Sequence, residues 1–255
     1  MGLNKCFLFI LLLAGSTTGQ ERVRTIHVFV ALCDNEHQGI VPVPQKLGNG
    51  EDPANNLYWG AMYGTKTFLT KSKDWTLVAT RKNPGDTVLE RVIFRHKTTR
   101  AYLVADAYRG ARIKDTVQDF LDAAAGNHPK IVEFQKESLG IHGSADLVVY
   151  VGHNGLMDFT IEPRTSDKDA KPRDAMVLAC KSRPYFEPHL SQLKCRPVLL
   201  TTGFMAPEAY TLEAAVAGRL AGESADKIVE RAARAYDKYQ KCGPKAARRL
   251  FYSGQ

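Results

Sequence analysis

Short runs of almost continuously apolar residues constrain the fold of this chain more than any other feature. Residues 145–152 read ADLVVYVG, and similar runs occupy residues 24–34, 174–182 and 196–203. An apolar run without alternation indicates a strand that is buried on both faces, which is typical of a parallel sheet covered by helices. A further short strand is predicted at residues 75–80.

Helical patterns alternate with these strands, and residues 87–110 predict a β-hairpin. The predicted helices are 56–70, 113–126 closed by Gly126, 207–222 with Pro207 in its first turn, and 224–243 with Ser224 as N-cap and Gly243-Pro244 as its end. This alternation predicts an α/β fold with a mainly parallel central sheet and helices on both faces. Because no linker-like break interrupts it, residues 21–255 are predicted to form a single domain.

The first twenty residues predict a secretory signal peptide. Lys5 precedes an apolar run over residues 6–14, and small residues follow, so cleavage is expected near Gly19 or Gln20. The run is too short to cross a bilayer. The mature protein is therefore expected to be secreted or periplasmic, without a membrane segment. An uncleaved N-terminal anchor is the lesser alternative.

The composition excludes several classes of function. The chain has a net charge of +8 that falls to +7 once Lys5 is removed, and the excess collects in residues 231–251. We interpret this segment as a solvated helix face, because no nucleic-acid-binding motif accompanies it. No phosphate-binding or dinucleotide-binding glycine motif is present, and the histidines lack a metal-ligand spacing. The sequence thus predicts no nucleic-acid partner, no cofactor and no metal, and it leaves the oligomeric state open.

Two reactive side chains directly follow two of the predicted strands. His153 follows LVVYVG, and Cys180 follows AMVLA. Parallel strands end at the same edge of a sheet, where α/β proteins bind their ligands. A cysteine nucleophile needs a base within hydrogen-bonding reach, and a histidine on a neighbouring strand end would supply it. The spacing therefore predicts a His153/Cys180 catalytic dyad.

The segments VVYVGHNG and AMVLACKS together resemble the caspase-like cysteine peptidases, a group that includes caspases, legumains, clostripain and gingipains. The shared signature is an apolar strand ending in His-Gly, followed by an apolar strand ending in Ala-Cys. The resemblance implies a three-layer caspase-haemoglobinase fold, with His153 as general base or acid and Cys180 as nucleophile. It also implies an oxyanion hole formed by the backbone N–H groups of Asn154 and Cys180. The Gln-Ala-Cys-x-Gly pattern of true caspases is absent, so the bacterial branches are nearer.

The substrate pocket is expected near two aspartates. Asp34 ends the first strand, and Asp106 corresponds, by the same resemblance, to an aspartate that lines a pocket for basic side chains in gingipains. The predicted function is a secreted or periplasmic cysteine endopeptidase that acts on a peptide or protein substrate. The alternative is a non-catalytic binding or assembly module of the same fold, because Asn154 stands where the family has glycine. A redox pair of Cys33 and Cys180 is a third possibility.

The sequence allows more than one interpretation of several further residues. Cys195 and Cys242 could form a disulfide, whereas Cys33 is expected to be a buried thiol. Asp158 could orient His153 or lie in a surface turn. Residues 48–65, rich in Asn, Gly and aromatic residues, indicate either a ligand or partner site or a capped helix with its aromatic residues in the core.

Overall fold

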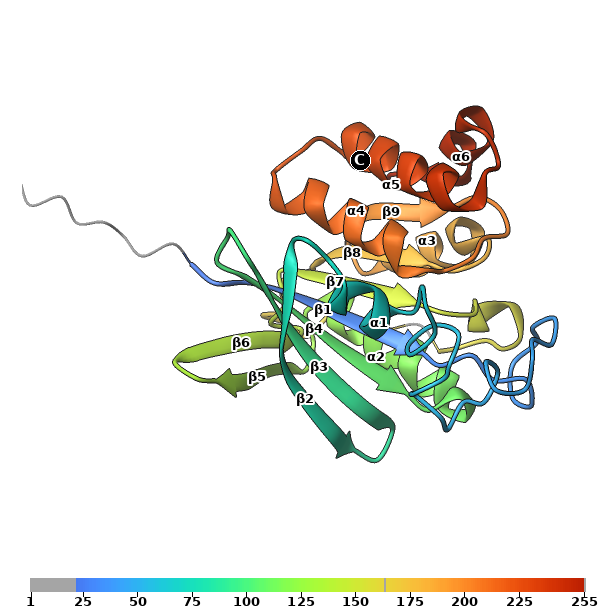
Figure 1. Ribbon diagram of the computed structural model, residues 1–255. Helices are drawn as coiled ribbons and strands as arrows, with labels where there is room; N and C mark the ends of the chain where they lie inside the picture. The colour runs from blue at the N-terminus through green and yellow to red at the C-terminus, as the bar shows by residue number, and fades with distance from the viewer. Residues whose placement is uncertain (1–21, 163, 255) are drawn as a thin grey trace, which may run out of the picture.

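An eight-stranded mixed sheet runs through the middle of the protein (Figure 1). The computed structural model describes residues 22–162 and 164–254, so the predicted signal peptide lies outside the described residues. The strand order across the sheet is β10-β9-β8-β7-β1-β4-β3-β2. Its strands are β1 Arg24–Ala31, β2 Trp75–Gly85, β3 Val88–His96, β4 Ala101–Tyr108, β7 Leu147–Val151, β8 Asp174–Leu178, β9 Pro197–Thr201 and β10 Phe251–Tyr252.

The centre of the sheet is parallel, as its apolar runs predict. Strands β4, β1, β7, β8 and β9 all point the same way, whereas β3, β2 and β10 are antiparallel additions at the two sides. Every residue of β4, β7, β8 and β9 is buried. Such strands bury apolar side chains on both faces, which is why they lack the polar alternation of a half-exposed sheet.

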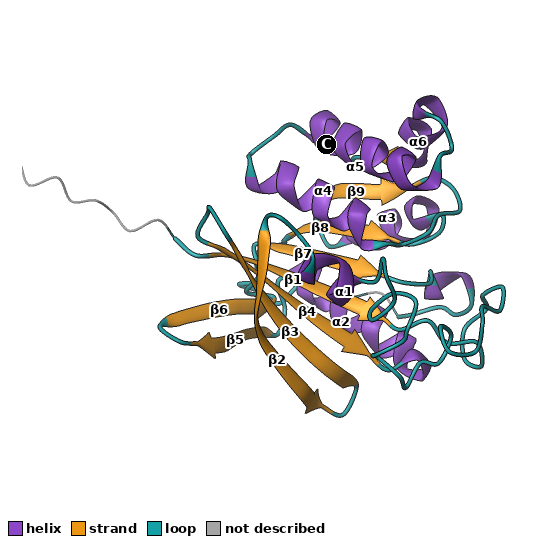
Figure 2. Ribbon diagram, viewed as in Figure 1, coloured by secondary structure: helices purple, strands orange, loops and turns teal. Residues whose placement is uncertain are grey.

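Helices cover both faces of this sheet, so the predicted α/β architecture is confirmed (Figure 2). Val28 and Val30 of β1 face the side covered by α1, α4 and α5, whereas Phe29 and Ala31 face α2 and α3. The alternation follows from the two-residue period of a strand. The helices are α1 Thr65–Thr70, α2 Ile113–Ala125, α3 Ser182–Gln192, α4 Ala209–Leu220, α5 Ala225–Gln240 and α6 Pro244–Leu250, with single 3₁₀ turns η1 Gly110–Arg112 and η2 Gly155–Met157.

Several elements differ from the sequence-based expectation. Strands β5 Pro129–Phe134 and β6 Glu137–His142 form a separate hairpin that the prediction missed, as it missed α3, α6 and β10. The helix predicted over residues 56–70 begins only at Thr65, because residues 57–64 form successive turns. Helix α4 begins two residues after Pro207, and Pro244 opens α6 rather than merely ending α5.

The suggested Cys195–Cys242 disulfide is wrong for this structure. All four cysteines of the described residues carry free thiols. Cys195 is buried and its Sγ lies 2.6 Å from the carbonyl oxygen of Arg173, whereas Cys242 is exposed. Burial raises the pKa of the Cys195 thiol to about 12, so it behaves as a small apolar side chain.

Candidate active site at the carboxyl ends of strands β7 and β8

Glycine allows the chain to turn out of the sheet just before His153. Gly152 has a φ of 149°, which L-residues with a side chain rarely adopt, and its N–H still donates to the carbonyl of Leu178 on β8. A Cβ at this position would lie 2.9 Å from the carbonyl oxygen of Ala31 on β1. The first glycine of the Gly-His-Asn-Gly segment is therefore required by backbone geometry alone.

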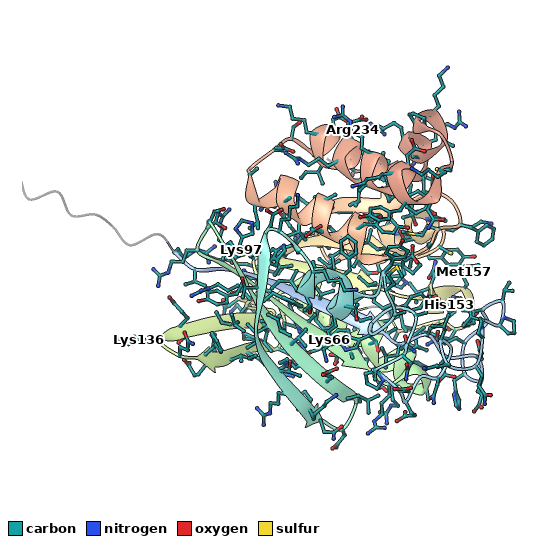
Figure 3. The ribbon with its side chains drawn as sticks, in the orientation of Figure 1. Lys66, Lys97, Lys136, His153, Met157 and Arg234 are labelled. Carbon is teal, nitrogen blue, oxygen red and sulfur yellow. The ribbon has the colours of Figure 1, made fainter. Side chains whose placement is uncertain are left out.

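Two hydrogen bonds fix the position of His153, which lies at the right-hand end of the sheet in Figure 3, close to Met157. The residue is 8% exposed, and its carbonyl accepts a hydrogen bond of 2.7 Å from the buried Tyr150 hydroxyl. Its ring Nε2 lies 2.7 Å from Oδ2 of Asp158, the residue that follows η2. Because a carboxylate only accepts hydrogen bonds, the neutral ring carries its proton on Nε2. Nδ1 is then the basic nitrogen, and it has no hydrogen-bond partner among the described residues.

Cys180 lies two residues beyond β8, at the start of α3. Its Sγ is 3.3 Å from both the backbone nitrogen and the carbonyl oxygen of Met205. Lys181 adopts a left-handed conformation, with φ 47°, and donates its N–H to Gly203. This sharp turn leaves Cys180 partly exposed at the N-terminal end of α3, where the helix dipole favours negative charge.

Asn154 joins the two strand ends. Strands β7 and β8 are adjacent and parallel, with Val151 opposite Leu178, and Asn154 Nδ2 donates to the carbonyl of Cys180 at 2.8 Å. Asn154 is fully buried, and its Oδ1 has no hydrogen-bond partner in the part of the chain that the structure describes. The structure thus brings the two segments of the predicted dyad together. Within residues 22–162 and 164–254, however, the His153 ring and the Cys180 thiol bond to Asp158 and Met205 and not to each other.

Asp34 organises a turn rather than facing the dyad. Its Oδ1 accepts the backbone N–H groups of Glu36 and His37 at 2.9 and 3.1 Å, and its Oδ2 lies 3.0 Å from His37 Nδ1. The hollow that it borders, about 140 Å³ in volume, is lined by residues 34–37, 45 and 48–51 and by neither His153 nor Cys180. The carboxylate of Asp34 is bound by its own loop, and its role in a substrate pocket stays a prediction.

Asp106 is likewise not available to a substrate. It is fully buried, and Arg91, directly opposite on β3, binds both of its oxygens at 2.6 Å. His27 Nε2 lies 3.1 Å from the same carboxylate. Burial alone raises the pKa of Asp106, but the hydrogen bonds from Arg91 and His27 outweigh it and hold that pKa well below its usual range. Asp106 is a structural anion inside the protein, which corrects its assignment to the substrate pocket.

The cluster around Asp106 also has the composition of a metal site. One ligand atom each from His27, Asp106 and His142 lies within 4.8 Å of the others. Their bonding does not fit a cation, because the backbone N–H of His142 donates to His27 Nδ1 and Arg91 donates to both oxygens of the Asp106 carboxylate. Lys130 Nζ lies 3.5 Å from His142 Nε2 and brings a second positive charge. We therefore interpret this cluster as a buried ion pair that joins β1, β3, β4 and β6.

Cys33 and several side chains of residues 48–65 are buried in the protein. Cys33 is fully buried, and burial raises the pKa of its thiol to about 11, against the opposing effect of a hydrogen bond with the Tyr58 hydroxyl. The buried Asn56 side chain binds the backbone N–H and carbonyl of Cys33 at 3.0 and 2.8 Å. The Trp59 indole donates to buried Glu90 at 2.8 Å. Tyr58 and Trp59 of this segment therefore lie in the core, and Tyr63 packs against it half-buried, although none of them is on the predicted helix.

Comparison with known proteins supplies no family for this chain. No protein-family model, curated protein or solved structure matches it significantly. No helix of the described residues combines the length and the apolar character that a membrane crossing requires.

Proposed function

We propose that this protein is a cysteine endopeptidase in which Cys180 is the nucleophile and His153 is the general base. The observation that carries the proposal is the placement of the two residues at the ends of adjacent parallel strands, tied by the hydrogen bond from Asn154 to the Cys180 carbonyl. The mainly parallel sheet with helices on both faces supports the finer proposal of a caspase-like fold. The apolar segment within residues 1–20 supports export from the cytoplasm.

The proposed reaction uses only side chains and backbone of this chain. His153 Nδ1 accepts the thiol proton while Cys180 Sγ attacks the carbonyl carbon of a peptide bond. The imidazolium then returns the proton to the leaving amine as the C–N bond breaks, and water hydrolyses the resulting thioester. Asp158 stabilises the imidazolium, because its carboxylate already lies 2.7 Å from Nε2.

An oxyanion in this reaction requires backbone donors. The N–H groups of Asn154 and Cys180 are the proposed pair, and neither has an acceptor among the residues that the structure describes. Cys180 is partly exposed whereas Asn154 is fully buried, so the Cys180 N–H is the better placed of the two.

The test is hydrolysis of a diverse peptide library by the mature protein. Cys180→Ala is expected to abolish turnover, and Cys195→Ala is the matched control, because Cys195 is buried beside the Arg173 carbonyl. Unchanged hydrolysis by Cys180→Ala would exclude Cys180 as the nucleophile.

A second candidate function is a non-catalytic binding module of the same fold. Two observations favour it: the Cys180 sulfur is already paired with the Met205 backbone at 3.3 Å, and the buried Asn154 replaces the glycine of the family pattern. A thiol-directed activity probe discriminates the two functions. Fast labelling of Cys180 that is lost in His153→Ala supports the peptidase, whereas slow labelling that does not depend on His153 supports the binding module.

A further inference from the structure

A buried glutamine fixes the segment that follows β1 to the start of η1. Gln38 is 8% exposed, and its Nε2 donates to the carbonyls of Leu32 and Gly110 at 2.7 and 3.1 Å. Its Oε1 accepts the N–H of Asp34 at 3.3 Å. All polar atoms of this amide are therefore engaged with backbone, which holds the neighbouring residue in place.

That neighbouring residue, Gly39, contacts the carboxylate that holds the candidate base. The Gly39 N–H donates to Asp158 Oδ2 at 2.9 Å, and the same oxygen lies 2.7 Å from His153 Nε2. Asp158 lies in an exposed turn, with 29% of its side chain accessible, so a single partner would leave its rotamer poorly defined. The second hydrogen bond restricts the carboxylate to the orientation that the histidine needs.

The approach of Gly39 to Asp158 leaves no room for a side chain. A Cβ at Gly39 would collide with the Asp158 carboxylate, with its Cγ only 2.9 Å away. Gly39 is exposed, and its backbone is outside the left-handed region, so alanine is compatible with the local fold. The added Cβ would meet only the flexible end of the Asp158 side chain, and this side chain can rotate away from His153.

We propose that Gln38 and Gly39 are positioning residues for the candidate active site: they fix Asp158, which in turn holds His153 with its proton on Nε2 and Nδ1 free for the Cys180 thiol. The catalytic meaning of this arrangement rests on the proposed peptidase function. The tautomer of the His153 ring does not depend on that function, and it can be measured whether or not the protein hydrolyses peptides.

The first readout is the tautomer of His153, observed by long-range ¹H–¹⁵N correlation in histidine-labelled mature protein near pH 8. The wild type is expected to show the Nε2–H tautomer. Gly39→Ala is expected to give a mixture of tautomers while folding normally. Gly85→Ala is the matched control, because a Cβ there meets nothing within 4 Å and its backbone is also outside the left-handed region. Gln38→Leu is expected to act like Gly39→Ala, with the exposed Gln45→Leu as its control.

The second readout is the rate at which Cys180 reacts with an activity probe. A misplaced base is expected to slow the His153-dependent reaction in Gly39→Ala by roughly 10- to 100-fold. A wild-type tautomer and an unchanged rate in folded Gly39→Ala would overturn the positioning role. If Gly39→Ala alters the tautomer but wild-type Cys180 shows no His153-dependent reactivity, the positioning role stands and the peptidase proposal fails.

Discussion

The buried histidine at the end of the β5–β6 hairpin predicts that this protein loses stability in mild acid. His142 is 5% exposed, and burial, followed by the nearby His27 and Lys130, lowers its pKa to about 2. An unfolded chain takes up the proton at a pKa of about 6.5. Below that pH the unfolded state binds more protons than the folded state, so the free energy of unfolding falls as the pH falls.

The size of this effect follows from linkage. For a histidine that stays neutral in the folded state, lowering the pH from 7.5 to 5.0 removes about 2 kcal/mol of stability. Burial also lowers the pKa of His27, which contributes in the same direction. Asp106 acts in a different window: because its folded pKa is depressed, its contribution is complete above about pH 4 and is lost only below it.

The assay is urea unfolding followed by tryptophan fluorescence at pH 7.5 and 5.0. His142→Asn removes the titrating group at a position with φ 50°, which asparagine tolerates, and it is expected to reduce the pH-dependent loss by about 2 kcal/mol. His128→Asn is the matched control, because that residue has φ 49° and its ring is 68% exposed. If His142→Asn retains the full wild-type difference between the two pH values, burial of a neutral His142 is not the cause of the acid sensitivity.

Three further predictions test the strand ends and the core. Gly152→Ala is expected to destabilise the protein by roughly 1–3 kcal/mol in urea unfolding, and by more than Gly222→Ala, which also has a positive φ but meets nothing within 4 Å. Cys33, fully buried with its pKa raised to about 11, is expected to react with iodoacetamide at pH 8 far more slowly than the exposed Cys242, as measured by mass spectrometry. Glu90→Gln is expected to lower the free energy of unfolding by roughly 1–3 kcal/mol, because the buried carboxylate is bound by two lysines and an indole, and an unchanged melting temperature would contradict this role.

The sequence predicted the parts of the fold that depend on local pattern. Helix α2 begins and ends where its periodicity and Gly126 indicate, and the β3–β4 hairpin turns between His96 and Ala101 as expected. The β5–β6 hairpin was missed because charged residues interrupt its apolar pattern, and because the hairpin pairs only with itself. The early start predicted for α1 is wrong because the turns at 57–64 depend on Asn56, whose side chain binds the distant backbone of Cys33.

In the candidate site, too, local patterns could be predicted from the sequence, whereas contacts between distant segments could not. Asp106 was expected to line a substrate pocket, but β4 continues to Tyr108 and the strand register places Arg91 opposite the carboxylate. Neither the register nor the ion pair is visible in a local pattern, because both depend on which strand lies next to β4. Asp158, left open between a turn and an orienting role, does both: it ends η2 and binds His153.

By itself, the sequence determined that His153 and Cys180 each follow a buried strand of an α/β sheet, since burial and periodicity are properties of short segments. Only the tertiary structure decided that these two strands are neighbours, and that Gln38, more than a hundred residues earlier in the chain, supports the loop that contacts Asp158. Strand pairing and loop closure are long-range contacts, whose free energy depends on the whole fold rather than on adjacent residues. The position of His153 after a buried strand can therefore be predicted from the sequence, whereas its neighbours Asp158 and Cys180 are determined by the folded chain.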